Sequence, residues 1–160
     1  MKKPKTDDEC WLGPSVKREN YLQMSNKEQE AYHAALLKSE IAIRGYVAVD
    51  TPTDKHAADL VAFRPENPSR TALWIQLKSR LTIDKRYTDK DLYIAFPEKP
   101  GNAGTDWFIY PHYDFVDFCD EEGKWVTNEW CWGVHGSYTS ISIPKWALIW
   151  LEQWRIPKRN

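Results

Sequence analysis

The pattern of apolar and polar residues predicts one long helix in the first third of the chain. Ser25 and Glu28 have the spacing of a capping box, which marks a helix start. Gly45 stands where a helix end favours a left-handed residue. Between these boundaries apolar side chains recur at helical spacing, and Glu30 lies one turn ahead of them on the same stripe. The stripe consists of Ala34, Leu37 and Ile41.

Short apolar runs bounded by turn residues predict strands after this helix. The runs at 57–63 and 72–80 are joined by a short turn, so we expect them to be antiparallel neighbours. The charged stretch 81–91 is expected to be a loop with solvated side chains. The full set of expected strands is 46–50, 57–63, 72–80, 92–96 and 107–111.

The last third of the chain is rich in aromatic residues and alternates between helical and irregular patterns. We expect a short helix at 112–119, a hairpin within 123–143, and a final helix that begins at Pro144 and ends at Pro157. Four side chains of that helix are expected to form a buried or interface stripe. They are Trp146, Ile149, Trp150 and Trp154.

The order of these elements predicts an α/β (α+β) fold with a central mixed β-sheet flanked by helices. Residues 1–24 are polar and contain two prolines, so we expect them to form an N-terminal arm. Residues 25–160 are expected to form a single domain, because about this length of chain builds one packed core. The aromatic-rich segment 112–160 would be its C-terminal part.

Composition limits the classes of function. The formal net charge of the 160 residues is −1, which excludes a generally basic nucleic-acid-binding protein and leaves only a local basic patch. The three cysteines follow no pairing pattern, which favours a reducing, cytoplasmic compartment over a disulfide framework. We find no signal-peptide pattern and no apolar run long enough for a bilayer, so no membrane partner is expected.

Three polar side chains interrupt the apolar runs at 57–63 and 72–80. Asp59 lies on the first run, and Gln76 and Lys78 share one face of the second because strand side chains alternate. Carboxylate and amide oxygens suit Mg²⁺, and a neighbouring lysine can stabilise charge on a phosphate. The alternative is structural: Asp59 would be a turn acid or strand-end ion pair, and Gln76 and Lys78 would face solvent.

This arrangement resembles a known family. The segment "IRGYVAVDTPTDKHAADLVAF" followed by "WIQLKSR" is similar to the PD-(D/E)XK nuclease superfamily, which includes Holliday-junction resolvases, many restriction enzymes and some homing endonucleases. The resemblance covers roughly 28–111 and implies a restriction-endonuclease-like fold with bound Mg²⁺ or Mn²⁺. By position, Asp59 would be the metal-binding aspartate and Lys78 the catalytic lysine. Gln76 would occupy the place usually held by Glu or Asp, as in a Gln-x-Lys subset of homing endonucleases.

The sequence departs from the family on the first helix, where the superfamily often has a glutamate. Ala34 and Ala35 occupy that region. Glu30 is a turn early but on the inward stripe, and Glu40 is later and off the stripe, so Glu30 is the preferred metal ligand and Glu40 the alternative. Either acid could equally be a surface residue, with Glu40 paired to Arg44.

The resemblance therefore predicts a Mg²⁺-dependent DNA endonuclease acting as a homodimer or higher homo-oligomer, since duplex cleavage cuts two strands. Ser79, Arg80, Lys85 and Arg86 are the expected contacts to the DNA backbone. The alternative is a catalytically decayed module of the same fold that binds DNA or a protein partner without cutting. A third interpretation is an aromatic-rich scaffold with no nucleic-acid role.

Overall fold

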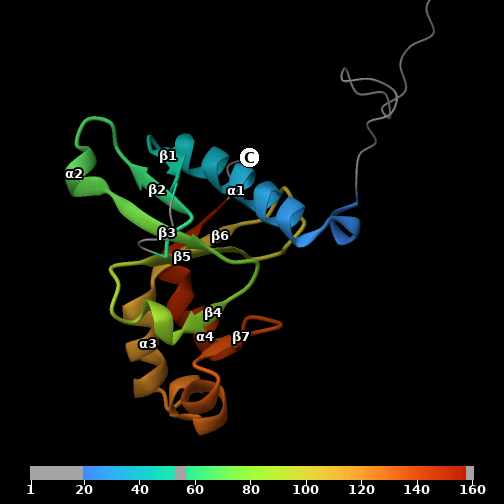
Figure 1. Cartoon of the computed structure of the whole chain (residues 1–160), viewed down its shortest axis with the longest axis vertical. Helices are drawn as coiled ribbons and strands as arrows, with labels where there is room; N and C mark the ends of the chain where they lie inside the picture. The colour runs from blue at the N-terminus through green and yellow to red at the C-terminus, as the bar shows by residue number, and fades with distance from the viewer. Residues whose placement is uncertain (1–19, 53–56, 158–160) are drawn as a thin grey trace, which may run out of the picture.

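The computed structural model describes residues 20–52 and 57–157. Within these residues a six-stranded sheet runs in the order β1-β2-β3-β5-β6-β8. Neighbouring strands are antiparallel except for the parallel pair β3–β5. Helices flank the sheet (Figure 1), so the prediction of a central mixed sheet with flanking helices is confirmed. The strands are β1 (Val47–Asp50), β2 (Leu60–Phe63), β3 (Leu73–Leu77), β5 (Tyr93–Pro97), β6 (Trp107–Pro111) and β8 (Arg155–Ile156).

Helix α1 (Asn26–Ala42) begins and ends where the sequence predicts. The Ser25 side chain accepts a hydrogen bond from the Glu28 N–H, and the Glu28 carboxylate accepts one from the Ser25 N–H, which completes the capping box. Gly45, just past the helix, has a φ of 83°, a left-handed conformation that favours glycine. The buried side of α1 is rotated slightly from the predicted stripe, because His33 is buried and Ala34 only half-buried.

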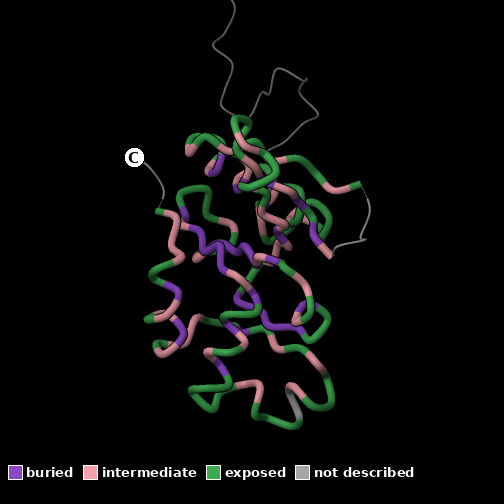
Figure 2. Tube along the Cα trace, turned by 90° about the vertical axis from the view of Figure 1, so that its left-hand side faces the viewer, coloured by how far each residue is buried: buried purple, intermediate pink, exposed green. Residues whose placement is uncertain are grey.

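The sheet has an apolar cluster on each face, which is why β5 and β6 are buried along nearly their whole length. Figure 2 shows the buried positions gathered in the interior of the molecule. On one face Leu37 and Ile41 of α1 pack against side chains such as Leu60 and Ile75. On the other face α3 (His112–Glu121) and α4 (Lys145–Leu151) pack against the remaining strand positions. That second cluster includes Ile94, Phe96, Phe108, Tyr110, Phe115 and Leu151.

The stretch 81–91 is not the solvated loop that its charge predicts. It contains β4 (Thr82–Asp84) and a 3₁₀ turn, η3 (Lys85–Tyr87), and β4 pairs with the distant β7 (Ser137–Thr139). Leu81 and Ile83 are fully buried on the α3 and α4 side, and Asp84 is only 5% exposed. The expectation fails because the many charged residues of this stretch outweigh Leu81 and Ile83 in the sequence pattern, although these two side chains belong to the core.

The expected hairpin within 123–143 is also wrong. The chain forms a 3₁₀ turn, η4 (Trp125–Thr127), and a π-helical stretch, η5 (Glu129–Val134), before β7 pairs with β4. The short helix predicted at 112–119 is confirmed by α3. A short helix, α2 (Pro68–Thr71), occupies the turn between β2 and β3.

The final helix is shorter than predicted and turns a different side inward. It ends at Leu151 and continues as a 3₁₀ turn, η6 (Glu152–Trp154), into β8. The fully buried side chains are Ala147 and Leu151, whereas Ile149 is 80% exposed, so the expected stripe is wrong at that position. The remaining stripe members, Trp146, Trp150 and Trp154, are partly buried against the core.

Most of the predicted N-terminal arm, residues 1–19, lies outside the described residues; its end forms a 3₁₀ turn, η1 (Tyr21–Gln23). In the described ranges no helix combines the length and apolar character that crossing a membrane requires.

We predict that a buried histidine makes folding pH-dependent. His112 is 0% exposed, its Nε2 accepts a hydrogen bond from the Asp84 N–H at 3.1 Å, and burial lowers its pKa from 6.5 to about 4. Between these values the unfolded chain binds a proton that the folded chain does not. The free energy of unfolding should therefore fall as the pH falls through this window, by up to about 1.4 kcal/mol per pH unit for this group.

Urea unfolding of the wild type and of His112→Gln across this pH window measures the effect. Glutamine can still accept the Asp84 hydrogen bond but does not titrate, so its profile should be flatter. Parallel profiles for the two proteins would contradict the assignment to His112.

Candidate functional site

The open ends of β2 and β3 bring together Asp59 and Gln76. The strands pair in an antiparallel register with Leu60 opposite Ile75, as the short connection predicts. Leu60 and Ile75 are buried under α1, so the next residues along the pleat, Asp59 and Gln76, face each other on the opposite side of the sheet. Gln76 also pairs with Ile94 of β5, which belongs to the cluster on the α3 and α4 side.

The Asp59 carboxylate bonds to β3 across the end of this strand pair. Its Oδ2 accepts hydrogen bonds from Gln76 Nε2 at 2.6 Å and from the Leu77 N–H at 2.7 Å. The Asp59 N–H donates to the Ile75 carbonyl at 2.9 Å. In this orientation the Gln76 amide is a donor, and a half-turn of the amide group would present its oxygen at the same place.

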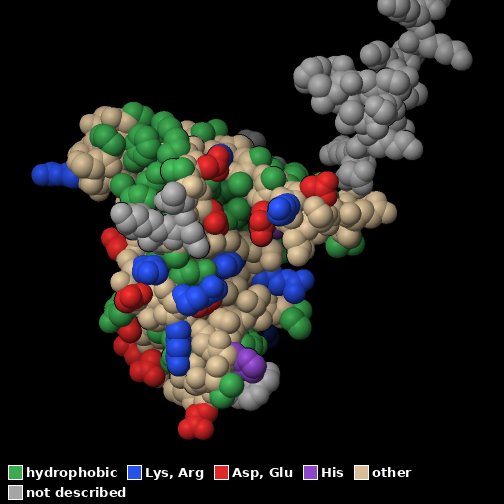
Figure 3. Space-filling view, viewed as in Figure 1, with side chains coloured by type: hydrophobic (Ala, Val, Ile, Leu, Met, Phe, Trp, Pro, Cys, Tyr) green, Lys and Arg blue, Asp and Glu red, His purple; other side chains and the backbone are tan. Residues whose placement is uncertain are grey.

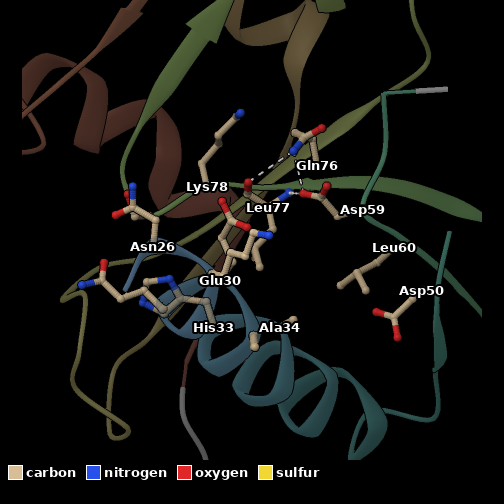
Figure 4. A pocket seen from close by; sticks show the side chains of 14 residues that line it. Asn26, Glu30, His33, Ala34, Asp50, Asp59, Leu60, Gln76, Leu77 and Lys78 are labelled. Carbon is tan, nitrogen blue, oxygen red and sulfur yellow. Dashed lines mark hydrogen bonds between the residues drawn. The ribbon is translucent and has the colours of Figure 1, made fainter. Parts of the chain in front are cut away.

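Lys78 follows directly after β3 and is held at its backbone by an N–H bond to the Ala95 carbonyl at 2.9 Å. Its Nζ lies 5.5 Å from the centre of the Tyr87 ring. Figure 4 shows the Gln76 and Lys78 side chains extending from β3 away from α1, with the Asp59 carboxylate beside Gln76. The three residues thus share one side of the sheet, as strand alternation predicts.

A cavity of about 600 Å³ lies between the N-terminal half of α1 and the ends of β2 and β3. Glu30 enters this cavity from α1 and points toward the end of β3, from the side opposite to Lys78 (Figure 4). The candidate acids, the amide and the lysine therefore all line one cavity at the end of one strand. The polar residues that line the cavity are Asn26, Lys27, Gln29, Glu30, His33, Asp50, Asp59, Gln76, Lys78 and Ser79.

The structure separates the two candidate helix acids. Glu40 does not line the cavity; its carboxylate lies 3.1 Å from Arg44 Nη1, an ion pair with i,i+4 spacing. This is the Arg44 pairing that the sequence leaves open for Glu40, but the Glu40 side chain is only 13% exposed, so the expected surface position is wrong. Glu30 is thus the helix acid that lines the same cavity as Asp59 and Gln76.

The four predicted DNA contacts do not form one cluster. Ser79 lines the cavity, and Arg80 is exposed on the loop that follows β3. Lys85 Nζ lies 5.5 Å from the centre of the Trp132 ring, toward η5. Arg86 lies beside Lys78 and pairs with the buried Asp84.

Sequence reasoning missed two residues that line the cavity. His33 is 2% exposed, its pKa is lowered by burial, and its ring packs edge-on against Trp107. Asp50 ends β1 and pairs with Lys38 Nζ at 2.7 Å. Asp50 could have been found as the polar end of the strand that precedes Asp59, whereas His33 carries no signal that separates it from a core histidine.

The predicted oxygen donors for a hard cation that line the cavity are the carboxylates of Asp59 and Glu30 and the amide of Gln76. The Asp50 carboxylate also lines the cavity but is paired with Lys38. In ranges 20–52 and 57–157 no three His, Cys, Asp or Glu side chains converge in a way that could hold a metal ion. Any cation here would therefore need the Gln76 oxygen, water or a substrate oxygen to complete its coordination.

Comparison with known proteins gives no match: no protein-family model, no curated protein and no solved structure corresponds to this chain.

Proposed function

We propose that this protein is a metal-dependent endonuclease that hydrolyses phosphodiester bonds of DNA. The observation that carries the proposal is the direct contact between Asp59 and Gln76, at 2.6 Å across two neighbouring strands, with Lys78 one residue beyond β3. An acid, an amide and an ammonium group on one side of a sheet end are the groups that phosphodiester hydrolysis needs.

The sequence resemblance supports the same function. The mixed sheet with flanking helices agrees with the fold that the PD-(D/E)XK resemblance implies, and the resembling segment supplies α1, β1, β2 and β3. Asp59 and Lys78 stand at the motif positions of the metal-binding aspartate and the catalytic lysine. A restriction-endonuclease-like arrangement is therefore part of the proposal.

The donor set fits Mg²⁺, which takes oxygen ligands and commonly keeps several waters beside one or two carboxylates. Asp59 and Gln76 would hold the ion, and Glu30 would contribute from the α1 side of the cavity. When bound, such an ion activates water and neutralises charge on a phosphate. The hydrogen bonds from Gln76 and Leu77 hold the Asp59 carboxylate in one orientation for that role.

Lys78 is placed to act on the phosphate itself. Its side chain is half-buried and lies against the Tyr87 ring, which restricts its freedom before substrate binds. An ammonium group held in this way stabilises the negative charge that develops on a phosphate during attack by water. Cleavage of both strands of a duplex then requires a second copy of the site, so a homodimer or higher homo-oligomer is part of the proposal.

A second candidate is a catalytically decayed module that binds DNA or a protein without cutting. The observation that favours it is the absence of three converging acidic, histidine or cysteine ligands from the described part of the chain. In addition, Gln76 turns its Nε2 and not its oxygen toward Asp59. The two candidates differ in metal binding and in strand cleavage, and both can be measured.

Cleavage is tested by Mg²⁺-dependent nicking of supercoiled plasmid and of branched DNA. Lys78→Ala should lower the nicking rate by about 100-fold or more, because a positioned charge that acts in the transition state is lost. Lys145→Ala removes an exposed lysine on α4 and should leave the rate unchanged. Equal rates for wild type and Lys78→Ala would remove Lys78 from the mechanism.

Metal binding is tested by calorimetry with Mn²⁺. Asp59→Asn keeps the shape of the side chain and removes its charge, and should abolish binding. Glu30→Gln should weaken binding by about 10-fold or more if Glu30 holds the ion or orients its waters. Glu40→Gln is the matched control on the same helix and should bind as the wild type does. An absence of binding by the wild type would favour the non-catalytic module.

A further inference from the structure

A second hollow, of about 500 Å³, adjoins the cavity at the same strand ends. Asp59, Gln76 and Lys78 line both spaces, so these residues stand between them. The second hollow is bordered by Arg86 and Tyr87 of η3 in place of α1. It therefore lies on the side toward which Gln76 and Lys78 extend (Figure 4).

Arg86 is held at this hollow by a buried acid. Its Nε lies 3.0 and 3.1 Å from the two oxygens of Asp84, and its Nη2 lies 2.6 Å from Oδ2. The Asp84 side chain is 7% exposed, whereas the Arg86 side chain is 74% exposed. A guanidinium that is bound by a buried carboxylate presents its charge in a defined direction.

Asp84 stays ionised beneath Arg86. Burial acts to raise the pKa of Asp84, but hydrogen bonds from the Arg86 side chain and backbone N–H, together with the charges of Arg86 and Lys78, hold it below its usual range. The Arg86 N–H donates to Asp84 Oδ1 at 2.9 Å. The acid therefore remains a full partner for the arginine at neutral pH.

The Tyr87 ring lies against both Lys78 and Arg86 at the second hollow. The ring is contacted by Lys78 Nζ at 5.5 Å and by Arg86 Cζ at 5.6 Å. The ring itself is 5% exposed and packs edge-on against His112 at 5.6 Å, so it is a rigid platform. Lys78 and Arg86 therefore both lie against this ring, and both line the second hollow.

We propose that this second hollow binds a phosphate group of a DNA strand, with Lys78 and Arg86 as its ligands. The identification of the strand as DNA rests on the proposed function. The phosphate would lie beside Asp59 and Gln76, which line the same hollow. Arg86 is then a phosphate-binding residue, and Asp84 and Tyr87 are positioning residues that act through it.

The surrounding charge agrees with this assignment. Several Lys and Arg side chains gather over the middle of this face, with acidic side chains around them (Figure 3). Lys85 has the same charge and is a direct neighbour in sequence, but its Nζ lies against the Trp132 ring and its stem packs near Gly136. Of the adjacent cations in η3, Arg86 is therefore the one that borders the hollow.

The test measures equilibrium affinity for a fluorescein-labelled DNA duplex in EDTA, so that no cleavage or metal binding contributes. Arg86→Gln should weaken binding about tenfold or more, as expected for a lost charged hydrogen bond. Arg70→Gln is the matched control, because Arg70 is an exposed arginine on α2, at the far ends of β2 and β3. Equal affinities for the two variants would overturn the proposal.

The Asp84→Asn variant distinguishes two roles for Arg86: a side chain that Asp84 positions, or a positive charge that acts wherever it lies. It removes a negative charge near the hollow, so it should tighten DNA binding if Arg86 acts only by its charge. If Asp84 positions Arg86, binding should weaken instead. Tighter binding would overturn the positioning role.

The Arg86→Lys variant keeps the positive charge and an ion-pair partner for Asp84. It replaces Asp84→Asn in the test if thermal unfolding shows that Asp84→Asn does not fold. Weaker binding by Arg86→Lys supports the site, and unchanged binding overturns it. Failure of this proposal is distinguishable from failure of the proposed function. If Arg86→Gln loses affinity for DNA but nicking does not depend on Lys78, the phosphate-binding proposal is supported and the proposed nuclease function is contradicted.

Discussion

Asp59 and Gln76 meet because β2 and β3 pair in a register that apolar burial determines. Leu60 and Ile75 lie opposite each other beneath α1, and a slip of one residue would turn both toward the other face. The same register places the acid and the amide opposite each other at the open end of the ladder. The chemistry of the site is therefore a consequence of how the core is packed on the other side of the sheet.

Residues from both sides of the sheet border the site. Glu30 reaches the strand ends from the α1 layer, whereas Lys78 and Arg86 lie on the side of η3. Asp59 and Gln76 stand between these groups and line both spaces.

The parallel pair β3–β5 connects the site with the second half of the chain. After β3 the chain passes through β4 and η3 before it returns as β5, and this connection carries Asp84, Arg86 and Tyr87. Its apolar residues, Leu81 and Ile83, are buried in the cluster with α3 and α4. The connection is thus anchored by the core, which keeps its exposed arginine in place beside Lys78.

By itself the sequence determined α1, most strands of the sheet and the proximity of Asp59, Gln76 and Lys78. These follow from capping, alternation and a short connection, which are local properties. Only the tertiary structure showed that Glu30 lines the cavity while Glu40 pairs with Arg44. It also showed that Asp84 is buried, that β4 pairs with β7 and that Arg86 lies at the strand ends. These features depend on contacts between segments far apart in the chain, and local patterns carry no information about which distant surface an exposed-looking charge will meet.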